Sequence, residues 1–199
     1  TLTTDNEPHI AQSIFNQSPA FLEIGDVEGA TNIKLDNTSL SYTNWPQKGG
    51  KLLINKPESI LESSITQYLI VPQSRDRVYV SMLMQLEGSG DCVSEVNIFR
   101  NSETSTRQIF NLSLETNGLY IDHTDFVDNL ERTKVANYSG EVVCVVLEFS
   151  MGTTGQDTLK VYVNPDENKQ DIIPNAIIPG EFTFDRIQFK ATGNDAGTM

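Results

Sequence analysis

Apolar residues recur at every second position along most of this chain, and this alternation limits the fold more than any other feature. It is clearest at 77–86 (RVYVSMLMQL), 158–164 (TLKVYVN) and 182–190 (FTFDRIQFK). Side chains of a β-strand point alternately to opposite faces, so a period of two is typical of strands with one buried face. Turn clusters rich in Gly, Asn, Asp and Pro separate these segments. The pattern predicts an all-β protein, an antiparallel β-sandwich of the jelly-roll type.

Three segments depart from simple alternation. Residues 141–150 (EVVCVVLEFS) are nearly continuous in apolar residues, which predicts a strand covered on both faces. Residues 7–15 have weak helical signals, and 58–70 have either helical spacing or an irregular crossing into a strand. A chain of 199 residues suits one domain. We expect an N-terminal extension over 1–20, either a short helix or flexible, and a sandwich over 21–199 that continues beyond 199 in the native protein.

The charge of the chain excludes some partners. Its 27 acidic and 14 basic residues give a formal net charge of −13. Such a surface repels phosphate backbones, so we expect no nucleic-acid partner. No apolar run approaches the roughly 20 residues that cross a bilayer, so we expect no membrane insertion. An acidic surface tolerates neutral sugars and divalent cations.

The segment DTLKVYVNPDENKQ (157–170) runs from a strand into an oxygen-rich loop. Pro165 lacks an amide hydrogen and cannot continue a central ladder, so we expect the strand to end there. A residue before proline is driven toward extended conformations, which we expect of Asn164. The loop that follows is typical of a solvated turn.

The same residues carry a resemblance to a known family. LKVYVNPD with FTFDRIQFKATG is similar to the closing half of a concanavalin A-like (laminin G-like) jelly-roll domain of bacterial secreted and cell-surface proteins. Residues 38–54 (TSLSYTNWPQKGGKLLI) and 76–86 (DRVYVSMLMQL) resemble its early and central segments. The resemblance implies a binding or display domain outside the cytoplasm. In that family a further strand follows the Gly turn, and we expect it to be missing here or supplied otherwise.

The acidic segment EIGDVEG (23–29) is the candidate for catalysis. Retaining glucanases of the concanavalin-like fold carry Glu-x-Asp-x-Glu on one strand, so that the carboxylates share a face about 5–5.5 Å apart. Here the spacing is Glu23-x-x-Asp26-x-Glu28. Glu23 is out of phase with the other two unless Gly25 forms a bulge. A solvated acidic turn is the simpler interpretation, and we expect a non-catalytic domain. No Ser nucleophile motif supports a triad around His123.

Two loops offer oxygen ligands for calcium. Their candidate ligands are Asp122, Asp125 and Asp128 in one loop, and Asn164, Asp166 and Asn168 in the other. The second set begins like an EF-hand but has Lys169 where Gly is required and Asn175 where an acid is required. It is therefore not an EF-hand. The alternative interpretation is a charged surface that preserves solubility.

Aromatic residues are the candidate sugar platforms, because sugar rings stack on them. Trp45 is the only tryptophan and precedes Pro46, with Tyr42 and Tyr120 as further candidates. A Trp that caps the end of the sandwich is the alternative. The two cysteines, Cys92 and Cys144, form either two buried thiols or a disulfide, which would suit an extracytoplasmic protein.

Three functions remain. The first is a non-catalytic, extracytoplasmic module of a larger surface or secreted protein, which binds a polysaccharide or cell-surface glycan through a concave sheet face and loops, with calcium as a candidate cofactor. The second is an assembly subunit whose open sheet edge is completed by a protein partner. The third is a glycoside hydrolase or lyase that uses Glu23, Asp26 and Glu28.

Overall fold

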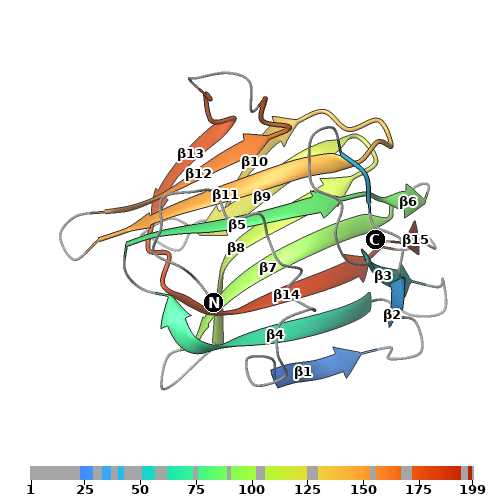
Figure 1. Ribbon diagram of the computed structural model, residues 1–199, viewed down its shortest axis with the longest axis horizontal. Coiled ribbons are helices and arrows are strands. Elements are labelled where there is room, and N and C mark those ends of the chain that lie inside the picture. The colour runs from blue at the N-terminus through green and yellow to red at the C-terminus, as the bar shows by residue number, and fades with distance from the viewer. Residues whose placement is uncertain are drawn as a thin grey trace.

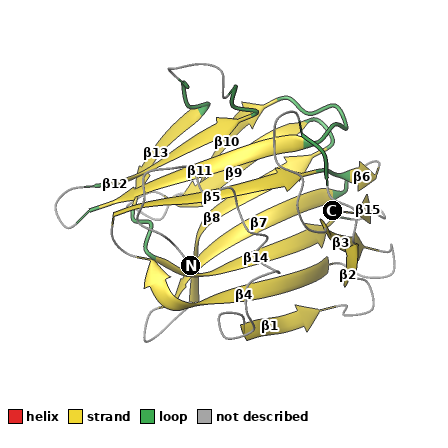
Figure 2. Cartoon of the chain, in the orientation of Figure 1, coloured by secondary structure: helices red, strands yellow, loops and turns green. Residues whose placement is uncertain are grey.

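A computed structural model of the protein describes residues 23–28, 33–36, 40–42, 51–56, 62–73, 76–88, 91–101, 106–124, 130–152, 156–166, 172–193 and 197–198. These residues form strands, turns and loops, and no helix occurs among them (Figure 2). Accordingly, the described ranges contain no helix of the length and hydrophobicity that would span a membrane. The expected extension over 1–20 lies outside the described residues.

The larger sheet has seven antiparallel strands, which do not follow one another in chain order. From one edge to the other they are β1 (Glu23–Glu28), β4 (Glu62–Gln73), β14 (Phe184–Thr192), β7 (Val93–Asn101), β8 (Thr106–Glu115), β9 (Gly118–Thr124) and β10 (Leu130–Ala136). Because β14 lies between β4 and β7, the end of the chain joins strands from much earlier in the sequence.

A second antiparallel sheet packs over the larger one (Figure 1). Its order is β13 (Ala176–Gly180), β12 (Asp157–Val163), β11 (Val143–Met151) and β5 (Asp76–Met84). A small third sheet has the order β2 (Ile33–Asp36), β3 (Lys51–Lys56), β15 (Gly197–Thr198) and β6 (Glu87–Gly88). β15 pairs on both sides, with β3 and β6. The expectation that a further strand is missing or supplied otherwise is not tested by this pairing and stays a prediction.

The core lies between the two larger sheets, and Phe149 of β11 joins them. The centroid of its ring lies 5.1 Å from that of Phe184, 5.7 Å from that of Phe182 and 6.5 Å from that of Phe110. All four rings are buried, and burial of one such side chain contributes about 1.5–3 kcal/mol to stability. Phe110 belongs to β8 and Phe184 to β14, so this aromatic group fixes the β-sandwich that the alternation predicts.

β11 is buried on both faces, as the apolar run at 141–150 predicts. Its odd-numbered residues from Val143 to Met151 belong to the core, whereas alternation directs Cys144 and Glu148 to the opposite face. Cys144 and Glu148 are nevertheless buried.

This alternation also explains why, of the two alternatives for the cysteines, the disulfide does not form. Cys92 and Cys144 are both buried and are not joined in a disulfide. Cys92, just before β7, belongs to the core between the sheets, while Cys144 lies on the face of β11 that points away from that core. The two thiols therefore occupy opposite faces of β11, and the disulfide hypothesis is wrong.

The helical interpretation of 58–70 is also wrong where the structure describes the segment. Residues from Glu62 onward form β4, which pairs with β1 on one side and β14 on the other. Ser64 and Thr66 are buried at alternate positions of this strand. Small polar residues on one face, rather than an apolar alternation, made the strand hard to distinguish from a helix.

Candidate functional site

One face of the seven-stranded sheet packs on the core, and the opposite face carries polar side chains across six strands. We call this set the polar face. Its members, by strand, are Ser64 and Thr66 (β4), Lys190 and Gln188 (β14), Glu95 and Asn97 (β7), Ser113 and Asn111 (β8), Tyr120 and Asp122 (β9), and Lys134 and Arg132 (β10). The alternate residues of the same strands, such as Val96, Leu112 and Ile121, fill the core. The pleat therefore builds the core and the polar face from the same segments.

The strand register arranges the polar face in two adjacent rows. The amide row contains, in order, Thr66, Gln188, Asn97, Asn111, Asp122 and Arg132. The lysine row contains Ser64, Lys190, Glu95, Ser113, Tyr120 and Lys134. Residues that are directly opposite on neighbouring strands have Cβ atoms about 4.5–5.5 Å apart, so side chains of one row contact each other.

A chain of hydrogen bonds runs along the amide row. Nδ2 of Asn111 donates to Oδ1 of Asn97 at 2.6 Å. Nδ2 of Asn97 in turn lies 3.3 Å from Oε1 of Gln188, and Nε2 of Gln188 lies 3.3 Å from Oγ1 of Thr66. Each amide thus fixes the orientation of the next one. A connected network of this kind is pre-organised, so little side-chain entropy remains to be lost when a ligand binds.

Lys190 is the centre of the lysine row. Its Nζ lies 3.2 Å from Oε2 of Glu62 and 3.3 Å from Oε2 of Glu95. Burial by itself lowers the pKa of Lys190, but the charges and hydrogen bonds of Glu95 and Glu62 outweigh burial, so the pKa is raised. Lys190 therefore remains protonated and holds both carboxylates in place.

A third group of contacts lies at the β9–β10 end of the polar face. Arg132 binds Glu115 through Nη2, lies 3.8 Å from Oδ1 of Asp122 through Nε, and stacks 4.4 Å from the centroid of the Tyr120 ring. The Tyr120 hydroxyl donates to Oδ1 of Asn117 at 3.0 Å. Tyr120 is thus covered by the guanidinium on one side and is fixed at its hydroxyl.

Asp122 has an unusual environment for a carboxyl group. Burial raises its pKa, the charge of Arg132 lowers it, and the charges of Glu115 and Glu95 raise it again, so that the net shift is upward. Asp122 is also the cross-strand neighbour of Asn111. A carboxyl that retains its proton to higher pH can donate a hydrogen bond as well as accept one.

Two polar atoms of the polar face lack a hydrogen-bond partner among the described residues. They are Oδ1 of Asn111 and Oγ of Ser113, on residues that are only 6% and 3% exposed. Native proteins pair more than about nine in ten buried polar groups, because leaving one unpaired costs about 1–3 kcal/mol. Oγ of Ser94 and Nδ1 of His123, in the core-facing phase of β7 and β9, also lack a partner among the described residues. On the polar face, the two unpartnered atoms are candidates for contact with a ligand.

The acidic segment 23–29 falls mainly in β1, at the edge of the seven-stranded sheet. The pairing of β1 with β4 places Glu23 opposite Tyr68 and Glu28 opposite Ser64, with a register shift between Ile24 and Val27. This shift is the irregularity near Gly25 that would bring Glu23 into phase with Glu28. Asp26 lies within the shifted stretch. The structure does not describe these side chains, so the catalytic hypothesis for Glu23, Asp26 and Glu28 stays a prediction.

The predicted sugar platforms are separated. Tyr120 lies on the polar face, whereas Tyr42 is half-buried in a short loop stretch outside the sheets. Trp45 lies outside the described residues. Of the two described tyrosines, Tyr120 belongs to the site that the register assembles, and it lies there under Arg132 rather than as a bare platform.

The predicted calcium ligands are not brought together where they are described. Asp122 lies in the seven-stranded sheet beside Arg132, and Asn164 follows β12 of the other sheet. Asp125, Asp128 and Asn168 lie outside the described residues, and Asp166 is exposed. Within the described ranges, no three acidic, His or Cys side chains form a group that could hold a metal ion. The calcium hypothesis stays a prediction.

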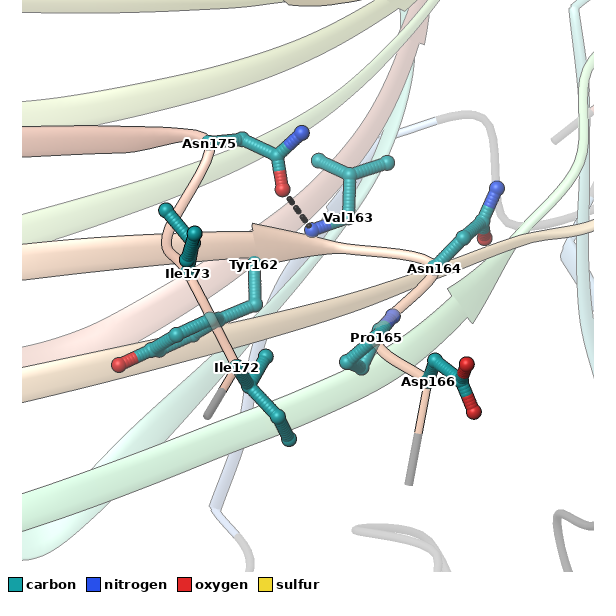
Figure 3. A pocket seen from close by; sticks show the side chains of 8 residues that line it. All are labelled: Tyr162, Val163, Asn164, Pro165, Asp166, Ile172, Ile173 and Asn175. Carbon is teal, nitrogen blue, oxygen red and sulfur yellow. Dashed lines mark hydrogen bonds between the residues drawn. The ribbon is translucent and has the colours of Figure 1, made fainter. Parts of the chain in front are cut away.

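Figure 3 shows a pocket of about 280 Å³ at the end of β12, where the strand runs into Pro165. Asn164 is not extended as expected but has a φ of 49°, in the left-handed region. Two hydrogen bonds to Cys144 hold it: Asn164 N donates to Cys144 O at 2.8 Å, and Asn164 Oδ1 accepts from Cys144 N at 2.9 Å. Asn tolerates this conformation better than most other non-Gly residues, so the Asn164 side chain stabilises the turn in which it lies.

The wall of this pocket is also committed to the fold. Oδ1 of Asn175 accepts a hydrogen bond from Val163 N at 2.8 Å (Figure 3). The Tyr162 hydroxyl donates to Oε2 of Glu148 at 2.8 Å, and burial with this bond raises the pKa of Tyr162 to about 12. The Tyr162 hydroxyl and the side-chain oxygens of Asn164 and Asn175 are therefore already hydrogen-bonded within the fold.

Sequence reasoning singled out Tyr120 and Asp122 but missed the rest of the polar face. Asn97, Asn111, Ser113 and Gln188 occupy the polar phase of strongly alternating strands, and the rows they form depend on register that the sequence does not display. The sequence did contain one signal of this site. The polar positions of the central strands carry uncharged amides and hydroxyls, where an exposed sheet face usually carries Lys and Glu.

Comparison with known proteins supports the fold. No protein-family model matches the chain, and no curated protein matches its sequence. The structure is similar to an endo-β-1,4-glucuronan lyase from the fungus Trichoderma reesei, with a TM-score of 0.53, 12% identity, and coverage of 85% of this chain and 79% of that one. It is also similar to the receptor-binding domain of botulinum neurotoxin type G, with a TM-score of 0.51, 10% identity, and coverage of 89% of this chain but only 40% of that one. A legume lectin-like domain from Entamoeba histolytica has a TM-score of 0.44, 6% identity, and coverage of 85% and 86%. At these identities the likeness concerns the fold alone: the protein is an antiparallel β-sandwich of the jelly-roll type.

Proposed function

We propose that this chain binds a saccharide across the polar face of its seven-stranded sheet. The observation that carries the proposal is the amide row, in which buried Asn97 and Asn111 are held in a fixed hydrogen-bond chain while Oδ1 of Asn111 remains without a partner. Amides and hydroxyls in fixed positions are the groups that recognise the hydroxyls of a sugar. The similarity to a glucuronan lyase supports a saccharide as the ligand class and assigns no residue.

The test is direct binding to a panel of soluble polysaccharides, measured by affinity electrophoresis and then by calorimetry. We expect Asn97→Ala and Asn111→Ala each to weaken binding by about tenfold or more, because each removes hydrogen bonds made in a buried environment. Tyr79→Ala is the control, because Tyr79 is 55% exposed on β5 of the other sheet. Equal loss of binding in all three variants, or no binding by the parent protein, would refute the proposal.

The cellular location of the protein is part of the same proposal. We place the chain as a module of a secreted or cell-surface protein, in keeping with its resemblance to concanavalin A-like domains. Surface labelling of cells that express the full-length natural protein tests this location, and exclusive recovery from the cytoplasm would contradict it.

A second candidate function is saccharide cleavage, which one observation favours. The pKa of Asp122 is raised by burial and by the charges of Glu115 and Glu95. Glycoside hydrolysis requires a carboxylic acid that stays protonated before the reaction and then donates its proton to the glycosidic oxygen. This moves the candidate acid from β1 to β9. Release of reducing ends from a bound polysaccharide, lost in Asp122→Asn while binding persists, is the expected result. Binding of the polysaccharide without release of reducing ends would contradict the cleavage function and would be consistent with the binding function.

A further inference from the structure

The described cations around the polar face already have partners, and most of these partners are carboxylates. Lys190 lies between Glu62 and Glu95 at 3.2 and 3.3 Å. Arg132 binds Glu115 and also lies 3.8 Å from Asp122. A ligand carboxylate would therefore have to compete with a resident carboxylate for each of these two cations.

The two remaining cations, Arg186 and Lys134, do not provide an array of sites for the carboxylates of a ligand. Arg186, the next residue of β14 in the same phase, has its Nε 3.3 Å from Oδ1 of Asp185. Nζ of Lys134 donates to the carbonyl oxygen of Asn117 at 2.9 Å and lies 5.6 Å from the Tyr120 ring. Lys134 is exposed and belongs to β10, the edge strand of the sheet. One cation at the edge does not match a polymer with a carboxylate on every sugar.

Long-range electrostatics point the same way. The whole chain has a formal net charge of −13. Burial is the largest cause of the raised pKa of Asp122; the charge of Arg132 lowers this pKa, and the charges of Glu115 and Glu95 raise it, so both carboxylates add to the cost of a further negative charge at the β9 end of the polar face. A polyanion that approached this face would meet like charge both locally and globally.

The unpartnered atoms specify what the ligand must bring. Oδ1 of Asn111 is an acceptor without a donor among the described residues, and Oγ of Ser113 also lacks a partner there. An ionised carboxylate has no hydrogen to donate, whereas a sugar hydroxyl both donates and accepts. Sugar hydroxyls, which neutral sugars and uronates both carry, therefore match Oδ1 of Asn111, whereas the additional carboxylate of a uronate finds no donor in that atom.

We infer that the polar face takes a neutral polysaccharide rather than a uronic-acid polymer. This inference rests on the proposed saccharide-binding function. It distinguishes the chain from the glucuronan lyase that shares its fold, and it assigns Glu62, Glu95 and Glu115 the role of excluding anionic chains by occupying Lys190 and Arg132.

The experiment compares neutral polymers (β-glucans, xylan and galactomannan) with uronans (polyglucuronate, alginate and polygalacturonate) in the same binding assay. We expect binding to a neutral polymer that changes less than about twofold between about 50 and 500 mM salt, since no ion pairs form with the ligand. Preferred, salt-sensitive binding to a uronan would overturn this inference while leaving saccharide binding intact. Absence of binding to every polymer would instead overturn the proposed function, and this inference with it.

A charge variant tests the assigned mechanism. Removing both partners of Lys190, in the double variant Glu62→Gln/Glu95→Gln, leaves its ammonium group for a ligand carboxylate. We expect uronan affinity to rise by about tenfold, the size expected of one charge-assisted hydrogen bond. The control is Glu141→Gln with Glu131→Gln, two exposed acids outside the polar face whose loss changes the net charge equally. An equal gain in the control variant, or no gain in either, would show that pairing at Lys190 does not set the ligand class.

Discussion

Ser113→Ala should make the protein more stable while it weakens saccharide binding. Ser113 is 3% exposed, and its Oγ has no hydrogen-bond partner among the described residues. An unpaired buried hydroxyl costs about 1–3 kcal/mol, and the lower strand propensity of Ala offsets a few tenths of that gain. We therefore expect the free energy of unfolding to rise by about 1 kcal/mol, which corresponds to an increase of about 2–4 °C in Tm for a chain of this size.

The structure offers a matched control in Ser94→Ala. Ser94 is also fully buried, and its Oγ is also unpartnered among the described residues. However, Ser94 lies in the phase of β7 that faces the core, between Cys92 and Val96. This variant should gain a similar amount of stability and keep the affinity of the parent protein for the saccharide.

Urea unfolding followed by tryptophan fluorescence and circular dichroism measures both variants, with m-values compared to confirm that the two-state slope is unchanged. Destabilisation of Ser113→Ala by about 1 kcal/mol or more would show that its hydroxyl serves the fold, and would refute the reasoning that the polar face gives up stability for function.

Three further predictions concern the frame around the site. Tyr138→Phe should cost about 1–3 kcal/mol, because the hydroxyl accepts a hydrogen bond from Leu86 N at 2.9 Å and donates to Leu86 O at 3.1 Å, and chemical denaturation measures the loss. Gly193→Ala should cost more than the roughly 1–3 kcal/mol of backbone strain expected for Gly140→Ala, because a Cβ at Gly193 would lie 1.9 Å from a backbone oxygen whereas one at Gly140 meets nothing within 4 Å; equal losses would contradict this. Because the pKa of Asp122 is raised above its ordinary 3.8, the folded state binds more protons than the unfolded state between that value and the raised one, so stability should fall as pH rises through this window; the decline should be smaller in Asp122→Asn.

The sequence was sufficient for the fold class because alternation and turn residues agree along the chain. The apolar run around Cys144 and Phe149 indicated a strand covered on both faces, and β11 is one. β4 was ambiguous because Ser64 and Thr66 occupy alternate positions that an amphipathic strand would fill with charged residues. Sequence patterns describe burial well but do not show which polar residues are buried away from the core.

The candidate site was largely hidden from sequence reasoning because it is created by register. The amide hydrogen bonds join Asn111 to Asn97, Asn97 to Gln188 and Gln188 to Thr66. The last of these pairs is separated by 122 positions in sequence. Oxygen-rich loops can be recognised in the sequence because their residues are consecutive. In one of these loops, however, the side chain of Asn164 accepts a hydrogen bond from Cys144 N and stabilises the turn. Each row of the polar face takes one residue from each of six strands, so the site produces no local sequence motif.

Binding of a saccharide at the amide row is measured most directly by nuclear magnetic resonance of the labelled protein during titration with a neutral oligosaccharide from the polymer that binds best. Side-chain amide signals of Asn97, Asn111 and Gln188 report on the amide row individually. If the saccharide lies across the polar face, these signals shift most, together with backbone amides of β7, β8 and β14. Shifts confined to the pocket around Tyr162 and Asn175, with the amide row unchanged, would contradict it.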